Sequence, residues 1–298
     1  MHKILMGAAA TAALMMAGAA AAQAPAPAPA PPAVVPVVVT QVKPGLYVLS
    51  ENGGNTTLRV GKDALLVVDT KNPGPAVHAE LIKAIRSVSA LPVKEVVVTH
   101  HHADHSGGIG DFEADGATVT TNVGLPAQLD KGYTAAGGFK PAKPTKTYDK
   151  TTEVKINGAT ARLLHFDPGH TGGDTLVYFP DLKVVSGGDE IVAVTPNIDF
   201  VYGGSLVGLL DSLNQVAKLD FDTVVPGHGA ITLTRAQFEE YRKKIDTVVA
   251  RGRASIKGGT TKEAFLASIK TDDLGWNLMT PAWNAPARLD VLYAELSK

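Results

Sequence analysis

The segment Val96–Gly108, which reads VVVTHHHADHSGG, constrains the fold of this chain more strongly than any other part of its 298 residues. Its valines predict a buried strand, and that strand runs directly into four histidines and an aspartate. His100 and His102 are two residues apart, so in extended backbone their side chains project to the same side. Asp104 and His105 follow where the chain turns toward two glycines. Imidazole and carboxylate at this spacing are typical ligands of zinc or a similar divalent ion, which predicts a metal site at the end of the strand.

Three later segments each deliver one residue of the same kind at a glycine-rich strand end. They read DPGHTGGD at residues 167–174, SGGD at 186–189 and VVPGHG at 224–229. Taken singly, each is typical of an ordinary turn. Together with the first cluster, they place five histidines and two aspartates at the rim of one sheet system: His100, His102, Asp104, His105, His170, Asp189 and His228. Four of these lie within six residues and can serve two ions instead of crowding one.

The composition excludes several other kinds of chemistry. Cysteine is absent, which rules out disulfides, thiolate zinc sites, iron–sulfur clusters and a cysteine nucleophile. A net charge of -1 gives no basic footprint for nucleic acid, so we expect no nucleic-acid partner. At 45% apolar residues the chain is too apolar to be disordered and is long enough for a sizeable core.

The first 38 residues are predicted to lie outside the folded domain. Residues 1–22 combine Lys3 with an uncharged Ala-, Leu- and Met-rich stretch that ends in three alanines, which is typical of a secretory signal peptide cut near Gln23. A transmembrane anchor is the alternative, but alanine and glycine make the stretch only weakly hydrophobic. We therefore expect a periplasmic or secreted protein without stable membrane insertion. The Ala/Pro-rich residues 23–38 favour an extended linker, with docking onto a partner as the alternative, and residues 39–298 form the domain.

Within that domain, short β-branched runs alternate with helical patterns. We expect strands at residues 46–50, 56–60, 64–69, 94–99, 159–166, 175–179, 183–186 and 223–225. We expect helices at residues 75–89, after Ser205, after a capping box formed by Thr234 and Gln237, at 261–270 and at 286–296. Residues 131–150 show no period and predict an exposed loop. Interspersed strands and helices predict an α/β or α+β fold with layers of sheet and helix.

The motifs THHHADH (residues 99–105), GHTGGD (169–174), GGD (187–189) and PGHG (226–229) resemble, in the same order, those of the metallo-β-lactamase fold superfamily. The resemblance implies a four-layer αββα sandwich with metals at one edge. It implies that one ion is held by His100, His102 and His170, and a second by Asp104, His105 and His228. Asp189 then bridges the two ions. Asp69, which ends the strand ALLVVD, matches a family aspartate that supports the metal loop from outside the ligand set.

This allocation is chemically sensible, because three protein ligands per ion leave room for water, as in catalytic sites. We expect two Zn²⁺ ions, although iron and manganese suit the same ligands. Two such ions can share a hydroxide that attacks a carbonyl carbon, and Asp104 is the candidate catalytic residue that orients this nucleophile or passes a proton.

The expected function is that of an exported di-metal hydrolase that cleaves an ester, thioester, lactone or amide bond in a small-molecule substrate. A zinc β-lactamase with only histidine and aspartate ligands is the first alternative, but Asp189 departs from that subclass, which lacks a bridging carboxylate. Retention of Asp189 is more similar to glyoxalase II and the lactonases. An iron-dependent redox protein of the superfamily and a metal- or partner-binding protein are further alternatives.

Overall fold

The computed structural model describes residues 33–135 and 142–298, and their compact unit runs from Val34 to Lys298. The predicted signal peptide, residues 1–22, lies outside the described residues, as do residues 23–32 of the predicted linker. Residues 33–37 have no regular secondary structure, and the first strand begins at Val38. No helix in the described ranges is both long and apolar enough to cross a bilayer.

Two mixed β-sheets form the centre of the unit. In the seven-stranded first sheet, β1 to β4 pair as an antiparallel meander, and β5, β6 and β7 then add in parallel. Its strands are β1 (Val38–Lys43), β2 (Leu46–Ser50), β3 (Thr56–Val60), β4 (Leu65–Val68), β5 (Val93–Val97), β6 (Thr118–Asn122) and β7 (Lys146–Tyr148).

The second sheet has six strands in the order β13-β12-β11-β10-β9-β8, and only its β11 and β12 pair in parallel. Its strands are β8 (Thr151–Ile156), β9 (Ala159–Leu164), β10 (Leu176–Phe179), β11 (Val184–Ser186), β12 (Thr223–Val225) and β13 (Leu233–Thr234).

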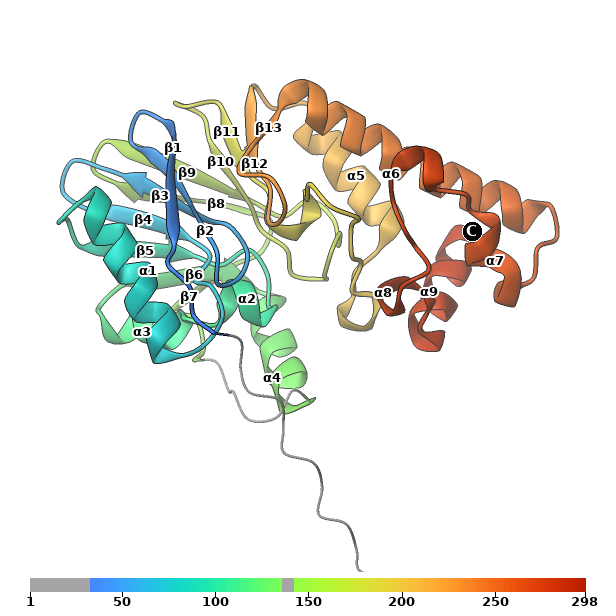
Figure 1. Ribbon diagram of the computed structural model, residues 1–298, viewed down its shortest axis with the longest axis horizontal. Helices are drawn as coiled ribbons and strands as arrows, with labels where there is room; N and C mark the ends of the chain where they lie inside the picture. Colours follow the sequence, from blue (N-terminus) through green and yellow to red (C-terminus); the bar gives the residue numbers. More distant parts are fainter. Residues whose placement is uncertain (1–32, 136–141) are drawn as a thin grey trace, which may run out of the picture. The chain divides into compact units, whose positions relative to one another are not determined.

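Helices cover the outer faces of both sheets (Figure 1). Those beside the first sheet are α1 (Pro75–Val88), α2 (Ala103–Ser106), α3 (Ile109–Ala114) and α4 (Leu125–Ala135). Those beside the second sheet and toward the C-terminus are α5 (Leu206–Val216), α6 (Arg235–Lys257), α7 (Lys262–Ser268), α8 (Pro281–Asn284) and α9 (Pro286–Leu296). The short 3-10 helices are η1 (Gly188–Glu190), η2 (Phe200–Tyr202) and η3 (Asp272–Leu274). This order of layers confirms the predicted αββα sandwich of α/β (α+β) class.

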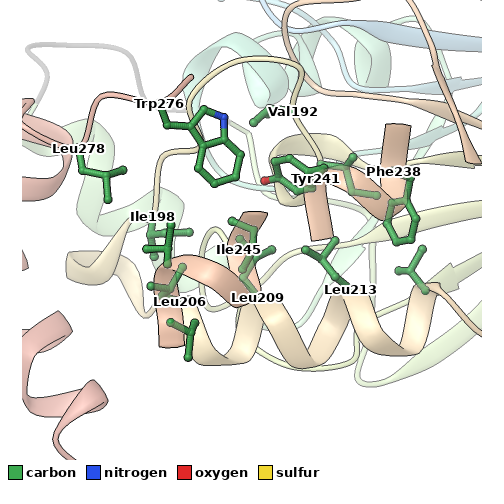
Figure 2. Packing of buried hydrophobic residues seen from close by; sticks show 14 of the residues in the cluster. Val192, Ile198, Leu206, Leu209, Leu213, Phe238, Tyr241, Ile245, Trp276 and Leu278 are labelled. Atoms are coloured by element: carbon green, nitrogen blue, oxygen red, sulfur yellow. The ribbon is translucent and has the colours of Figure 1, made fainter. Parts of the chain in front are cut away.

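The period of two along each strand explains why the layers form. In β4, Leu65 and Val67 pack in the cluster that includes Leu81 of α1, whereas Leu66 and Val68 face the second sheet. A strand that is apolar on both faces can be satisfied only between two layers, and each fully buried Leu or Val contributes about 1.5–3 kcal/mol. A third cluster joins the second sheet to α5 and α6, where side chains of both helices interlock beside Trp276 (Figure 2).

Local sequence signals set the helix ends where they were predicted. Thr234 and Gln237 form the expected capping box at the start of α6. Ser205 caps α5 by accepting a hydrogen bond from the backbone N–H of Gly208. The helix predicted at residues 75–89 is found as α1.

The predicted exposed loop at residues 131–150 is wrong at both ends. Helix α4 continues to Ala135, and Lys146–Tyr148 forms strand β7. Strand β7 exists because it pairs in parallel with β6, itself not predicted, and such a pairing between distant residues leaves no local period in the sequence. Residues 136–141 of the predicted loop lie outside the described residues.

A buried lysine joins the β2–β3 hairpin to the segment that follows β4. Lys71 is fully buried after β4, and its Nζ donates hydrogen bonds of 2.6 Å to the backbone carbonyls of Leu49 and Gly54. Burial lowers the pKa of Lys71 to about 7, although Asp69 opposes the shift. The β2–β3 loop is therefore tied to the segment that follows β4.

Lys71 should make the free energy of unfolding rise with pH. The folded-state pKa of Lys71 is about 7, so the folded chain releases this proton as the pH rises above 7, while the unfolded chain retains it. The free energy of unfolding increases with pH wherever the unfolded state binds more protons than the folded state. The contribution approaches about 1.4 kcal/mol per pH unit. Urea unfolding between about pH 7.5 and 9.5, with a chelator present, measures the slope. Lys71→Met should lose this slope and Lys155→Met, which removes an exposed lysine, should keep it. Equal slopes in wild type and Lys71→Met would contradict the assignment.

Candidate metal centre

The seven predicted ligands come from loops that leave the two sheets at one edge. Four lie in the β5–α2 segment, and the others follow β9, β11 and β12: His100, His102, Asp104, His105, His170, Asp189 and His228. Asp174 closes the turn that carries His170, since its carboxylate accepts hydrogen bonds from the backbone N–H groups of Gly169 and Thr171. A side chain at Gly227 would clash with Oδ1 of Asp189, so the glycine before His228 lets the two loops approach.

The first group contains His100, His102, His170 and Asp189, which offer one ligand atom each within 4.8 Å of one another. Nε2 of His170 lies 3.0 Å from Nδ1 of His102. Oδ2 of Asp189 lies 3.8 Å from Nε2 of His170 and 4.0 Å from Nε2 of His100. These atoms surround a common centre, as the ligands of a single ion do.

The second group contains Asp104, His105 and His228, whose ligand atoms are equally close. Nε2 of His228 lies 3.1 Å from both Nε2 of His105 and Oδ2 of Asp104. Asp189 reaches this group as well, with Oδ1 at 3.3 Å from Nε2 of His105 and Oδ2 at 3.5 Å from Nε2 of His228. The structure thus brings all seven predicted ligands together, with one carboxylate between two groups of three.

The charges of the first group suit a cation. Burial holds the pKa of His100 well below its usual range and lowers that of His170 to about 4, so both imidazoles are neutral and have a lone pair to offer. Burial alone would raise the pKa of Asp189, but the charge and hydrogen bond of His105, whose own pKa is raised well above its usual value by Asp189 and Asp69, more than offset it, and the carboxylate stays ionised. Neutral imidazole and ionised carboxylate are the forms that bind divalent metal.

Among the candidate ligands, two buried atoms have no hydrogen-bond partner in the described part of the chain: Nε2 of His100 and Oδ1 of Asp189. Buried polar atoms are almost always satisfied, and both of these point into the ligand groups. An ion in each group would satisfy them, so the residues present fit a two-metal site. Of the ligands, His102, Asp104 and His228 are partly exposed and the others are largely buried, so the centre opens to solvent on one side.

Asp69 lies behind the second group. Its Oδ2 lies 2.7 Å from Nδ1 of His105, and its carboxylate also accepts hydrogen bonds from the backbone N–H and the hydroxyl of Thr99. The aspartate is buried and adopts a left-handed backbone conformation (φ 68°), which is uncommon for a residue other than glycine. Because Nδ1 of His105 donates its hydrogen bond to Asp69, its Nε2 faces the second ligand group.

The β2–β3 loop also supports the second group, and sequence reasoning did not single it out. Its Gly54 N–H donates to the carbonyl of Asp104 at 3.0 Å, and its Asn55 N–H donates to that of Gly227 at 2.8 Å. A Cβ at Gly54 would clash with the imidazole of His105. The only signal was the turn sequence ENGG, which predicts a hairpin loop but no contact with a site.

The segment that follows Asp189 supports the first group and was also missed. The carbonyl of Asn197 accepts a hydrogen bond of 2.5 Å from Nδ1 of His170, and Oδ2 of Asp199 lies 2.9 Å from Nε2 of His102. His101, buried beside this segment, has its ring centroid 4.7 Å from that of Tyr202. The sequence TPNIDF has neither a glycine-rich turn nor a strand before it, so no pattern pointed to these contacts.

Comparison with known proteins gives a consistent family. Residues 49–228 match the sequence model of the metallo-beta-lactamase superfamily. The chain is 27% identical over 229 residues to the alpha subunit of 2,4-dinitroanisole O-demethylase from Nocardioides sp. strain JS1661, with 75% of this chain and 67% of that one covered. It is 29% identical over 191 residues to hydroxyacylglutathione hydrolase from Hyphomonas neptunium, covering 64% and 66% of the two chains.

A third relative is the atrochrysone carboxyl ACP thioesterase of Aspergillus fumigatus, 25% identical over 236 residues, with 73% of this chain and 51% of that one covered. The chain thus spans about half to two thirds of the length of such curated relatives.

Solved structures show the same fold at low sequence identity. The metallo-beta-lactamase from Pontibacter korlensis superposes with a TM-score of 0.62 at 19% identity, over 70% of this chain and 99% of that one. The metallo-beta-lactamase FIM-1 from Pseudomonas aeruginosa, in its mono-zinc form, gives a TM-score of 0.60 at 20% identity, over 72% and 97%.

Gly54→Ala should remove metal from the second group alone. The new Cβ would displace the buried imidazole of His105, and such overpacking costs about 1–3 kcal/mol of stability. Zinc content measured by elemental analysis after dialysis should fall from two ions per chain to one. Gly258→Ala, at a position with φ of −76° and room for a methyl group, should keep both ions. Retention of both ions by Gly54→Ala would show that the loop does not govern His105.

Proposed function

From the premise that this chain belongs to the metallo-beta-lactamase superfamily, we propose that it is an exported metal-dependent hydrolase. It uses two divalent ions, with zinc as the first candidate. The bond that it cleaves is an ester, thioester, lactone or amide bond in a small molecule. One observation carries the proposal. The carboxylate of Asp189 lies within 4.0 Å of ligand nitrogens in both groups, as a residue shared by two ions would.

The two groups of candidate metal ligands indicate what each residue would do. His100, His102 and His170 would hold one ion, and Asp104, His105 and His228 the other, which leaves coordination positions open for water and substrate. When bound, such ions would lower the pKa of a coordinated water toward about 7 and would polarise a substrate carbonyl.

The chain's own groups position the nucleophile. Asp104 is partly exposed, and although burial opposes it, the hydrogen bond from His228 lowers the pKa of Asp104 to about 2. The carboxylate therefore stays ionised and would orient the attacking water by accepting a hydrogen bond from it. Asp69 keeps the Nδ1 proton of His105 in place, so that Nε2 stays a ligand.

The relatives support hydrolysis more than any one substrate. A hydroxyacylglutathione hydrolase and an acyl-carrier-protein thioesterase have names that describe bond cleavage, whereas the O-demethylase subunit acts on a different bond. The beta-lactamase structures share the fold at 19–20% identity, so they do not extend the proposal to β-lactams.

The test uses the mature protein, recovered from the periplasmic fraction of a bacterial host that makes the full chain. Its mass should correspond to a start at Gln23, and a mass that still includes residues 1–22 would contradict export. Loaded with zinc, it should hydrolyse at least one member of a panel of esters, thioesters, lactones, amides and a chromogenic cephalosporin. A chelator should abolish this activity and zinc should restore it.

Two variants sharpen the result. His102→Ala should lose more activity than the roughly 10–100-fold that loss of an outer partner of a ligand costs. His78→Ala, which removes a histidine of α1 that pairs with Asp115 at the end of α3, should leave activity unchanged. Cleavage of the cephalosporin alone would favour the β-lactamase alternative. Turnover that needs iron and oxygen, or full activity of His102→Ala, would overturn the proposal.

A further inference from the structure

The proton on the second ring nitrogen of His102 has an acceptor that no sequence motif indicates. Nδ1 of His102 lies 3.0 Å from Nε2 of His170, inside the first ligand group, while Nε2 lies 2.9 Å from Oδ2 of Asp199. A carboxylate can only accept, so this contact places the proton on Nε2 and leaves the lone pair on Nδ1, where the group needs it. Asp199 is buried, which fixes the direction of its carboxylate.

The same segment holds His170. The carbonyl of Asn197 accepts a hydrogen bond from Nδ1 of His170 at 2.5 Å, and the backbone N–H of Asp199 donates to the carbonyl of His170 at 2.7 Å. Three consecutive residues, Asn197–Asp199, therefore orient two of the three histidines of the first group.

Arg288, in α9, fastens this segment to the C-terminal helices. Its Nη1 donates to the carbonyl of Ile198 at 3.0 Å and to Oδ1 of Asn197 at 3.4 Å, and its Nη2 lies 3.3 Å from Oδ1 of Asp199. Nε1 of Trp283, from α8, donates to the carbonyl of Pro196 at 3.0 Å and fixes the start of the segment. Arg288 and Trp283 lie beyond residue 228, where the match to the family's sequence model ends.

We propose that Asp199 is a positioning residue for His102, that Arg288 holds Asp199 in place, and that together they set the metal affinity of the first ligand group without setting that of the second. The inference rests on the metal binding in the proposed function. The second group is oriented from elsewhere: Asp69, at the end of β4, accepts the proton of His105. Asp69 also binds the hydroxyl of Thr99, which lies 3.0 Å from Nδ1 of His100, so only His102 and His170 of the first group depend on the Asn197–Asp199 segment.

His101, His102 and Asp199 also lie close enough to hold an ion of their own. An ion there would need Nε2 of His102, the atom that Asp199 already engages, and Nε2 of His101 is 3.9 Å from Oδ2 of Asp199. The number of bound ions distinguishes a hydrogen bond between His102 and Asp199 from an ion held by these three residues.

The experiment measures zinc binding to the full mature chain by competition with a chromophoric chelator, which resolves two affinities without any assay of activity. Asp199→Ala should weaken one site by roughly 10–100-fold and leave the other within about twofold. Asp199→Asn keeps an oxygen that can accept the hydrogen bond from His102, so it should weaken the same site less than Asp199→Ala does. This variant also serves as a control in case Asp199→Ala fails to fold.

Arg288→Met should weaken the same site as Asp199→Ala, by a smaller factor. The matched control is Arg251→Met, which removes an exposed pair with Asp273 in the same C-terminal part of the chain and should change neither affinity. Cobalt substitution adds a spectroscopic check, because the absorption bands of one ion, and not both, should shift in Asp199→Asn.

Each contrary outcome has a distinct meaning. Unchanged affinities in Asp199→Ala, or equal losses at both sites, would overturn this inference and leave the proposed function intact. Three zinc ions in the wild type and two in Asp199→Ala would make Asp199 a ligand, which also overturns it. A wild-type chain that binds no zinc would overturn the inference together with the proposed function.

Discussion

The buried carboxylate of Asp189, placed between two groups of imidazole and carboxylate ligands, is the constraint on which the rest of this structure depends. Its negative charge is stabilised away from water chiefly by the charge and hydrogen bond of His105. Separate loops must therefore meet at one point, and their backbones approach so closely that Gly54 and Gly227 cannot bear a side chain. The sandwich supplies that meeting point, since the strands that carry the ligands end at the same edge.

The loops are held from two directions. On the first sheet, Lys71 ties the β2–β3 loop to the end of β4, and Asp69 directs His105. On the second sheet, Asn197 and Asp199 direct His170 and His102, and Arg288 connects them to α9. The arrangement connects the C-terminal helices to the candidate ligands at the edge of the sandwich.

The layers of the fold, and the meeting of the seven candidate ligands at one edge, could be predicted from the sequence because their signals are local. His100 and His102 share a side through the period of a strand, and β4 reads as a strand that is buried on both faces. Asp199, Arg288 and Lys71 could not be predicted, since each acts through contacts with residues distant in sequence and none lies in a recognisable motif. Strand β7 was missed for the same reason: its partner β6 defines it, and its own residues show no alternation. Asp69 also acts through contacts with residues distant in sequence, but it was predicted, because the resemblance to the superfamily indicated its role.

Diffraction from crystals grown with zinc, recorded on both sides of the zinc absorption edge, tests the central claim most directly. The account predicts two anomalous peaks about 3.5–4 Å apart, with the carboxylate of Asp189 between them. One peak should lie among His100, His102 and His170, and the other among Asp104, His105 and His228. A single peak, or a peak beside His101 and Asp199 in place of either, would contradict the account.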